Sequence, residues 1–223
     1  MVDAAAPRTG PLAVKPRLRG VSHQWAFFVS LACGAALVAV AGGGRAIAAA
    51  AIYAFSVSGL LGTSALYHRV TWRPDVRRWM RRLDHAMIFF LIAGTYTPIA
   101  LLALHGTLAT VVLAVVWGGA AAGIALKLGW IDAPKPVTAA IYVALGWVCV
   151  ATFGQLTSSI GIAAVCVLAF GGLLYTAGAV IYALGRPNPV PGVFGYHEVF
   201  HALVIAAAAA HYAVIAFVVL PRG

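Results

Sequence analysis

Long apolar stretches separated by short polar segments run through most of this 223-residue chain. Each of the seven is about twenty residues long or longer, which is enough for a helix to cross the ~30 Å hydrocarbon core of a bilayer. They cover residues 24–42, 46–68, 83–104, 107–128, 137–156, 160–184 and 194–220. The pattern predicts an all-α integral membrane protein, a bundle of seven transmembrane helices.

The polar segments between these stretches are short, so we predict a single membrane domain over residues 21–223. Residues 1–20 are polar and contain three prolines and four basic residues, and we predict a disordered basic cytoplasmic tail there. Residues 69–82 carry six arginines. Pro74 in this segment suits the first turn of a short helix lying in the membrane interface.

The composition supports a membrane protein and changes how the net charge is interpreted. The chain is 63% hydrophobic and 9% charged, whereas a soluble domain carries about 25% charged residues. A net charge of +10 could indicate a nucleic-acid partner. In membrane proteins, however, Lys and Arg collect in cytoplasmic loops, so we predict no nucleic-acid partner.

The distribution of basic residues predicts the orientation of the bundle. With the N-terminus inside the cell, thirteen Lys and Arg residues lie on the cytoplasmic side and two, Arg45 and Arg222, lie outside. This asymmetry follows the positive-inside rule. We therefore predict a multi-pass protein of the cell (inner) membrane with its N-terminus in the cytoplasm and its C-terminus outside.

Ionisable residues in membrane spans are costly and mark candidate functional sites. On the predicted topology, His68 ends the second span, Asp84 begins the third, and His197 and His201 begin the seventh, all at the cytoplasmic side. His197 and His201 are four residues apart and share one helix face, and Ser64 lies one turn before His68. Three imidazoles with an open position are typical of a catalytic Zn²⁺ site. The alternative is that these residues cap helix ends and face lipid headgroups.

The remaining histidines are predicted to lie outside this cluster. We expect His23 to be interfacial, His85 to be interfacial or hydrogen-bonded, and His105 to be solvated in an outer loop. His211 follows His201 by ten residues, or about 15 Å along a helix, so an interhelical hydrogen bond is expected for it.

Four short motifs carry a resemblance to a known family. They are Ser64-Ala65-Leu66-Tyr67-His68, Arg82-Leu83-Asp84-His85, Ala93-Gly94-Thr95-Tyr96-Thr97-Pro98, and Gly195-Tyr196-His197-Glu198-Val199-Phe200-His201. In this order they resemble the hemolysin III family, the bacterial branch of the progestin and adipoQ receptor group, which is related to adiponectin receptors and alkaline ceramidases. The resemblance covers nearly the whole chain from the first helix to the seventh.

The resemblance implies a seven-helix fold with its N-terminus inside and a specific set of site residues. It implies that His68, His197 and His201 bind Zn²⁺. It also implies that Asp84 and Ser64 position a zinc-bound water and thus take the catalytic roles.

The leading hypothesis is a zinc-dependent hydrolase of a lipid amide or ester, similar to a ceramidase, with a role in membrane homeostasis and membrane lipids as substrate. A second hypothesis is a membrane sensor or receptor without enzymatic activity, in which zinc is structural. A third is a hemolysin-type cytolytic protein, although pore formation by an apolar seven-helix bundle is hard to rationalise. A fourth is a bis-histidine haem protein, which absorbance near the Soret band would reveal.

The segment His197-Glu198-Val199-Phe200-His201 also matches H-E-x-x-H, in which the Glu is the general base of soluble metalloproteases. We predict a different role here, because Asp84 already lies at the same membrane level. Glu198 is expected to turn toward the loop or the headgroups and to favour the positive end of the seventh helix.

Reporter fusions test the predicted orientation. A fusion within residues 69–82 should report a cytoplasmic location, and a fusion after Gly223 should report an external one, because of the asymmetry in basic residues. A periplasmic signal from the loop, or a cytoplasmic signal from the C-terminus, would contradict the predicted topology.

Overall fold

The computed structural model describes residues 15–223, is 83% helical and contains seven spans long and apolar enough to cross a membrane. In chain order the elements are α1 (Val21–Ala39), α2 (Gly44–Arg69), α3 (Pro74–Leu102), α4 (Gly106–Gly129), α5 (Lys135–Gly146), η1 (Trp147–Thr152), α6 (Phe153–Ile160), α7 (Ile162–Leu184), α8 (Tyr196–Val214), η2 (Ile215–Val219) and η3 (Leu220–Arg222). The prediction of an all-α bundle with seven spans is confirmed.

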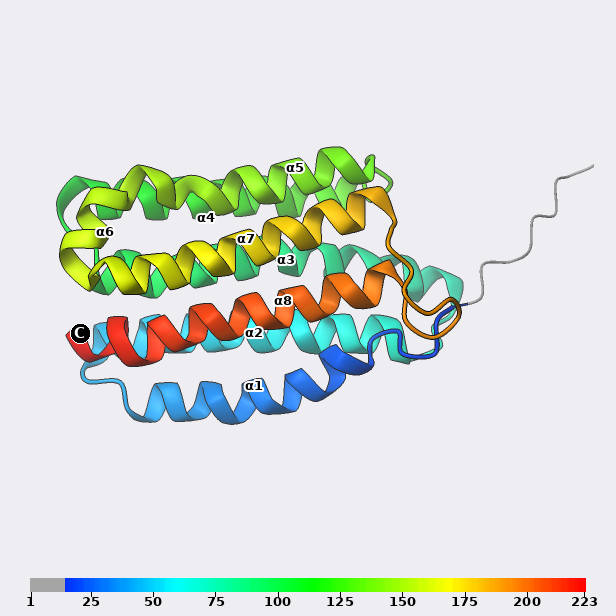
Figure 1. The fold of residues 1–223 in the computed structure, drawn as a ribbon, viewed down its shortest axis with the longest axis horizontal. Helices are drawn as coiled ribbons and strands as arrows, with labels where there is room; N and C mark the ends of the chain where they lie inside the picture. Colours follow the sequence, from blue (N-terminus) through cyan, green and yellow to red (C-terminus); the bar gives the residue numbers. More distant parts are fainter. Residues whose placement is uncertain (1–14) are drawn as a thin grey trace, which may run out of the picture.

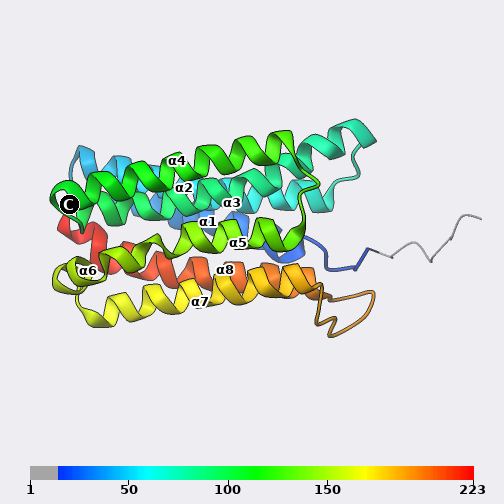
Figure 2. The same cartoon turned by 90° about the horizontal axis from the view of Figure 1, so that it is seen from above.

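The helices lie side by side along one long axis (Figures 1 and 2). Consecutive helices pack against each other from α1 to α4, α7 packs on α5 and α8, and α8 also contacts α1. Residue 15 and the C-terminus lie at opposite ends of the bundle (Figure 1). The end at which α2 and α7 finish and α3 and α8 begin is called the histidine end below, because it carries the cluster described in the next section.

Residues 74–82 of the arginine-rich segment are part of the third membrane helix, so the prediction of a separate short interfacial helix is wrong. Pro74 occupies the first turn of α3, and the helix continues without a break to Leu102. Arginine has a high helix propensity, and no Gly or Pro interrupts the chain between Asp75 and the apolar stretch. The basic turns project beyond the neighbouring helices at the histidine end (Figure 2).

The fifth span is built from three segments, and its end differs from the prediction. The α-helix changes to a 3-10 helix at Trp147, where the Tyr96 hydroxyl donates to Gly146 O at 2.7 Å and accepts from Cys149 N at 2.7 Å. The predicted gap between residues 156 and 160 is helical instead. The turn falls at Gly161, whose φ of 83° favours glycine.

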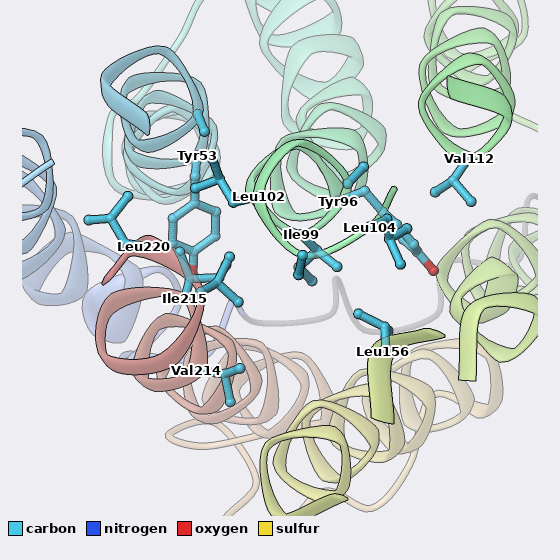
Figure 3. Packing of buried hydrophobic residues seen from close by; sticks show 14 of the residues in the cluster. Tyr53, Tyr96, Ile99, Leu102, Leu104, Val112, Leu156, Val214, Ile215 and Leu220 are labelled. Carbon is cyan, nitrogen blue, oxygen red and sulfur yellow. The ribbon is translucent and has the colours of Figure 1, made fainter. Parts of the chain in front are cut away.

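The most buried span is α3. Of the residues in its apolar stretch, 67% are buried inside the protein, whereas the share in every other span is at most 39%. It is therefore the central helix of the bundle. Figure 3 shows part of the apolar core, where Ile99 and Leu102 of α3 lie near Tyr53 of α2 and near Ile215 and Leu220 at the end of the chain. This apolar packing lies at the end of the bundle opposite the histidine end. The ionisable side chains of the cluster described in the next section lie at the histidine end.

Candidate metal centre

Three histidines meet at the histidine end of the bundle. His68 lies in the last turn of α2, and His197 and His201 lie in the first two turns of α8. Each offers one nitrogen, and these atoms all lie within 4.8 Å of one another. Nε2 of His68 and Nε2 of His197 are 3.1 Å apart, and all three side chains are buried. The predicted convergence of these residues is confirmed.

The donor set fits a divalent metal ion such as Zn²⁺. A tetrahedral Zn²⁺ with Zn–N distances of about 2.0–2.1 Å places its ligand nitrogens about 3.3 Å apart, close to the His68–His197 separation. One shared proton can join only two of the three imidazoles. Nδ1 of His201 is buried and has no hydrogen-bond partner among residues 15–223. A divalent cation, in contrast, would be bound by one nitrogen from each of the three neutral imidazoles.

Asp84 and Ser64 lie beside the three histidines. Asp84 Oδ2 is 3.9 Å from His68 Nε2 and 3.6 Å from His85 Nδ1, and its side chain is 12% exposed. Ser64 lies one turn before His68 on α2, is buried, and lines the same cavity as Asp84. The structure thus brings a carboxylate and a hydroxyl to the cluster, as their sequence positions suggested.

His23 also belongs to this cluster, and its prediction as an interfacial residue is wrong. It lies within α1, is only 2% exposed, and stacks on His201 with ring centroids 3.7 Å apart and ring planes 5° apart. Gly20, at the start of α1, lies directly against the end of α2, because a Cβ there would lie 2.6 Å from Cβ of His68. The stacked ring restricts the orientation of His201.

Both carboxylate oxygens of Glu198 are paired with groups other than the three histidines. Its Oε2 accepts a hydrogen bond from Gly195 N at 2.8 Å and so caps the N-terminus of α8. Its Oε1 forms an ion pair with Arg19 Nε. The predicted orientation toward the loop and the helix end is confirmed, but Glu198 is 2% exposed rather than facing headgroups.

Residues 15–20 cross the histidine end as a series of turns, which we call the strap. Residues 1–14 of the predicted tail lie outside the part of the chain that the structure describes. Backbone hydrogen bonds join the strap to the α7–α8 loop, from Arg17 N to Gly192 O at 3.0 Å and from Leu18 N to Val193 O at 3.2 Å. Lys15 Nζ donates to the backbone carbonyl of His68. The strap therefore connects the end of α2 and the loop before α8, the two segments at which the three histidines meet.

A cavity extends from the histidine cluster into the bundle. Asp84, His197 and His201 line one end of it, and Tyr175 and His211 also line it. Its apolar walls include Leu60, Ile88, Leu91, Ile92, Phe200 and Val204. The arrangement places the polar cluster at one end of a largely apolar chamber.

The remaining histidines follow their predictions. His85 contacts Arg81 O through Nδ1 at 2.9 Å and the Tyr182 hydroxyl through Nε2 at 3.1 Å. His105 is exposed just before α4. His211 bonds through Nε2 to Leu168 O on α7 at 3.0 Å, which confirms the interhelical hydrogen bond. The sequence did not indicate that His85 and His211 would also line the cavity.

The fold and the site define a class: a multi-pass helical membrane protein with a buried three-histidine cluster at one end of its bundle. The family model described as "Haemolysin-III related" matches residues 12–212, so the chain belongs to this family. It is similar to Hemolysin-3 of Bacillus cereus, at 31% identity over 81% of this chain and 79% of the relative. It is also similar to the Hemolysin-3 homolog of Bacillus subtilis (strain 168), at 28% identity over 74% of this chain and 75% of the relative. No solved structure was found to match the chain.

The ion pair between Arg19 and Glu198 should contribute substantially to stability. Replacing Arg19→Met leaves the buried carboxylate unpaired, which should cost about 3 kcal/mol and lower Tm by about 10 °C. The matched control is Arg73→Met, because Arg73 pairs with Asp75 at 3.7 Å with both side chains largely exposed, and such pairs contribute little. Equal melting temperatures for the two variants in detergent would contradict a structural role for the strap.

Removing one of the three histidines should remove bound metal. His68→Ala and His201→Ala should each lose most of the metal carried by the wild-type protein and should melt at a lower temperature, because metal binding is coupled to folding. Elemental analysis of purified protein measures the metal content. His105→Ala is the control, since His105 is exposed and lies outside the cluster. Full occupancy in either cluster variant would refute the ligand assignment.

Proposed function

We propose that this protein is a zinc-dependent hydrolase of a lipid amide or ester, acting in the inner membrane with a role in membrane homeostasis. The observation that supports it is the cavity, which His197, His201, Asp84 and Ser64 line beside the three-histidine cluster and which has apolar walls beyond them. Such a chamber suits a substrate with a reactive polar group joined to a long apolar chain.

His68, His197 and His201 would hold the Zn²⁺, leaving a fourth position open as in catalytic sites. When bound there, Zn²⁺ supplies Lewis-acid polarisation of a carbonyl oxygen and lowers the pKa of water. His23 would keep the His201 ring in place by stacking. The strap and Glu198 would hold the start of α8 against the end of α2.

Asp84 is the group best placed to move a proton. Its Oδ2 lies beside His68 and can accept a proton from an attacking water and return it to the leaving group. Ser64, one turn before His68, would orient the carboxylate or the water by hydrogen bonding. Arg81 O can only accept, so His85 Nδ1 donates to it, and Nε2 of the neutral His85 accepts from the Tyr182 hydroxyl. These two hydrogen bonds hold the His85 ring beside Asp84 in one orientation.

Membrane lipids are the proposed substrates because of the position of the cavity and the charge around it. The reactive end lies at the end of the bundle that carries the arginine-rich turns of α3. Basic residues at the cytoplasmic face attract anionic lipids, so this end suits a lipid whose headgroup stays near the surface. The apolar walls would exclude water from the acyl chain.

A membrane sensor with a structural metal would use the same three histidines but would not need Asp84 for turnover. The name of the Bacillus cereus relative, Hemolysin-3, indicates haemolysis by that protein. For this chain, the polar groups converging on one cavity favour hydrolysis over either alternative.

Asp84→Asn separates hydrolysis from metal binding. It should retain most of the Zn²⁺, because Asp84 is not one of the three converging ligands, and should reduce hydrolysis by about a hundredfold or more through loss of the general base. Glu198→Gln is the matched carboxylate-to-amide control and should keep both properties per folded molecule. The assay measures fatty-acid release from ceramide and ester lipids in proteoliposomes by mass spectrometry, alongside zinc content.

Two outcomes would contradict these assignments. Suppose that Glu198→Gln loses turnover with zinc retained, while Asp84→Asn stays active. Glu198 would then be the general base, and Asp84 would have the structural role. Absence of turnover in the zinc-loaded wild-type protein across both lipid classes would favour the sensor.

A further inference from the structure

The deep end of the cavity contains two polar groups that the proposed reaction does not use. Tyr175 of α7 and His211 of α8 both line the cavity. The Tyr175 hydroxyl and His211 Nδ1 are shielded from solvent, and neither has a hydrogen-bond partner within residues 15–223. Unpaired polar atoms in a membrane-embedded interior are destabilising, so a group that pairs with them there would be bound favourably.

The hydrogen bond from His211 to α7 determines what this pair offers to a ligand. Leu168 O can only accept, so His211 Nε2 must donate to it across 3.0 Å. In a neutral imidazole the other nitrogen, Nδ1, is then an acceptor. Gly171 leaves room for this ring, because a Cβ there would lie 2.5 Å from His211 Nε2.

Tyr175 complements this acceptor. Its ring lies 5.6 Å from the His211 ring, centroid to centroid, in an edge-on arrangement. The phenol hydroxyl can donate one hydrogen bond and accept another. Both side chains line the cavity and their rings are neighbours, so the pair offers one acceptor and one donor, which would suit a hydroxyl group that donates to one and accepts from the other.

The spacing along α8 sets the distance between this pair and the metal centre. His211 follows His201 by ten residues, or about 15 Å of helix. The cavity wall between the two ends includes Leu91, Ile92 and Val204 and offers mainly apolar contacts. An extended alkyl chain is a zigzag, so each C–C bond of about 1.5 Å advances it by only about 1.25 Å, and roughly twelve carbon atoms cover that distance.

We propose that Tyr175 and His211 form a subsite for a hydroxyl group carried on the chain of a lipid, roughly twelve carbons from the group held at the histidine cluster. Such a hydroxyl donates to His211 Nδ1 and accepts from Tyr175. The subsite would distinguish a mid-chain hydroxylated lipid from a plain acyl chain. This inference rests on the proposed use of the cavity by a lipid, but it does not depend on turnover.

A binding experiment tests the subsite without hydrolysis. The probes are 12-hydroxyoctadecanoic, 2-hydroxyoctadecanoic and octadecanoic acids, each competing with a fluorescent fatty acid bound to purified protein in nanodiscs. The 12-hydroxy acid should bind about five- to tenfold more tightly than octadecanoic acid, the gain expected from one or two hydrogen bonds. The 2-hydroxy acid should show no such gain, because its hydroxyl would lie near the histidine cluster.

Tyr175→Phe removes only the hydroxyl and should abolish the preference for the 12-hydroxy acid. Its melting temperature without ligand should equal or exceed that of the wild type, because the lost hydroxyl makes no hydrogen bond. Tyr212→Phe is the matched control and should keep the preference, since the Tyr212 hydroxyl donates to Cys33 O and does not line this cavity.

The possible outcomes separate the subsite from the proposed function. Equal binding of the 12-hydroxy and plain acids by the wild type would overturn the subsite and leave the lipid cavity intact; a bridging water alone at the pair would give this result. A preference that survives Tyr175→Phe would also overturn it. Failure of all three acids to displace the fluorescent probe would contradict lipid binding in the cavity. The subsite and the proposed function would then both be wrong.

Discussion

The contact between the end of α2 and the start of α8 is the constraint on which the histidine end depends. Segments 129 residues apart in the chain place two imidazole nitrogens 3.1 Å apart, which leaves little freedom for either helix to slide or rotate. The strap, the Gly20 turn and the ion pair of Glu198 all lie around this junction. Together these contacts hold the end of α2 and the start of α8 against each other without relying on a bound metal.

The environment of Glu198 explains why a motif from soluble enzymes changes meaning here. In H-E-x-x-H the two histidines share a helix face, whereas the residue after the first points about 100° away. In this chain that direction leads to the N-terminus of α8 and to the strap. There the carboxylate satisfies Gly195 N and pairs with Arg19. Asp84 lies on the other side of the junction, beside His68, because it belongs to α3, the central helix of the bundle.

Much of the fold and of the metal centre could be predicted because both depend on local or strongly constrained patterns. Seven apolar lengths must become helices, since each backbone group in a bilayer needs an internal partner. His197 and His201 share a face in any helix, and an odd number of spans separates the ends as observed. The turn at Gly161 was missed because Ser158 and Thr157 bond back to carbonyls of the preceding turn and continue the helix. The stacking of His23 on His201 depends on how α1 packs against α8, which no local pattern encodes.

The cavity joins the parts of the site that sequence could and could not reveal. At the histidine end, His201 Nδ1 is buried without a partner among residues 15–223, and deeper in the bundle Tyr175 and His211 each carry another unpaired atom. Tyrosine could be replaced by phenylalanine, which would keep the ring and remove the buried hydroxyl. An unpaired hydroxyl in a dry interior is destabilising, so a bound group that pairs with it would be held favourably. With His201 assigned to the metal, the unpaired atoms of Tyr175 and His211 are left for an occupant of the apolar chamber, which supports a ligand with a polar group on its chain over a cavity that serves packing alone.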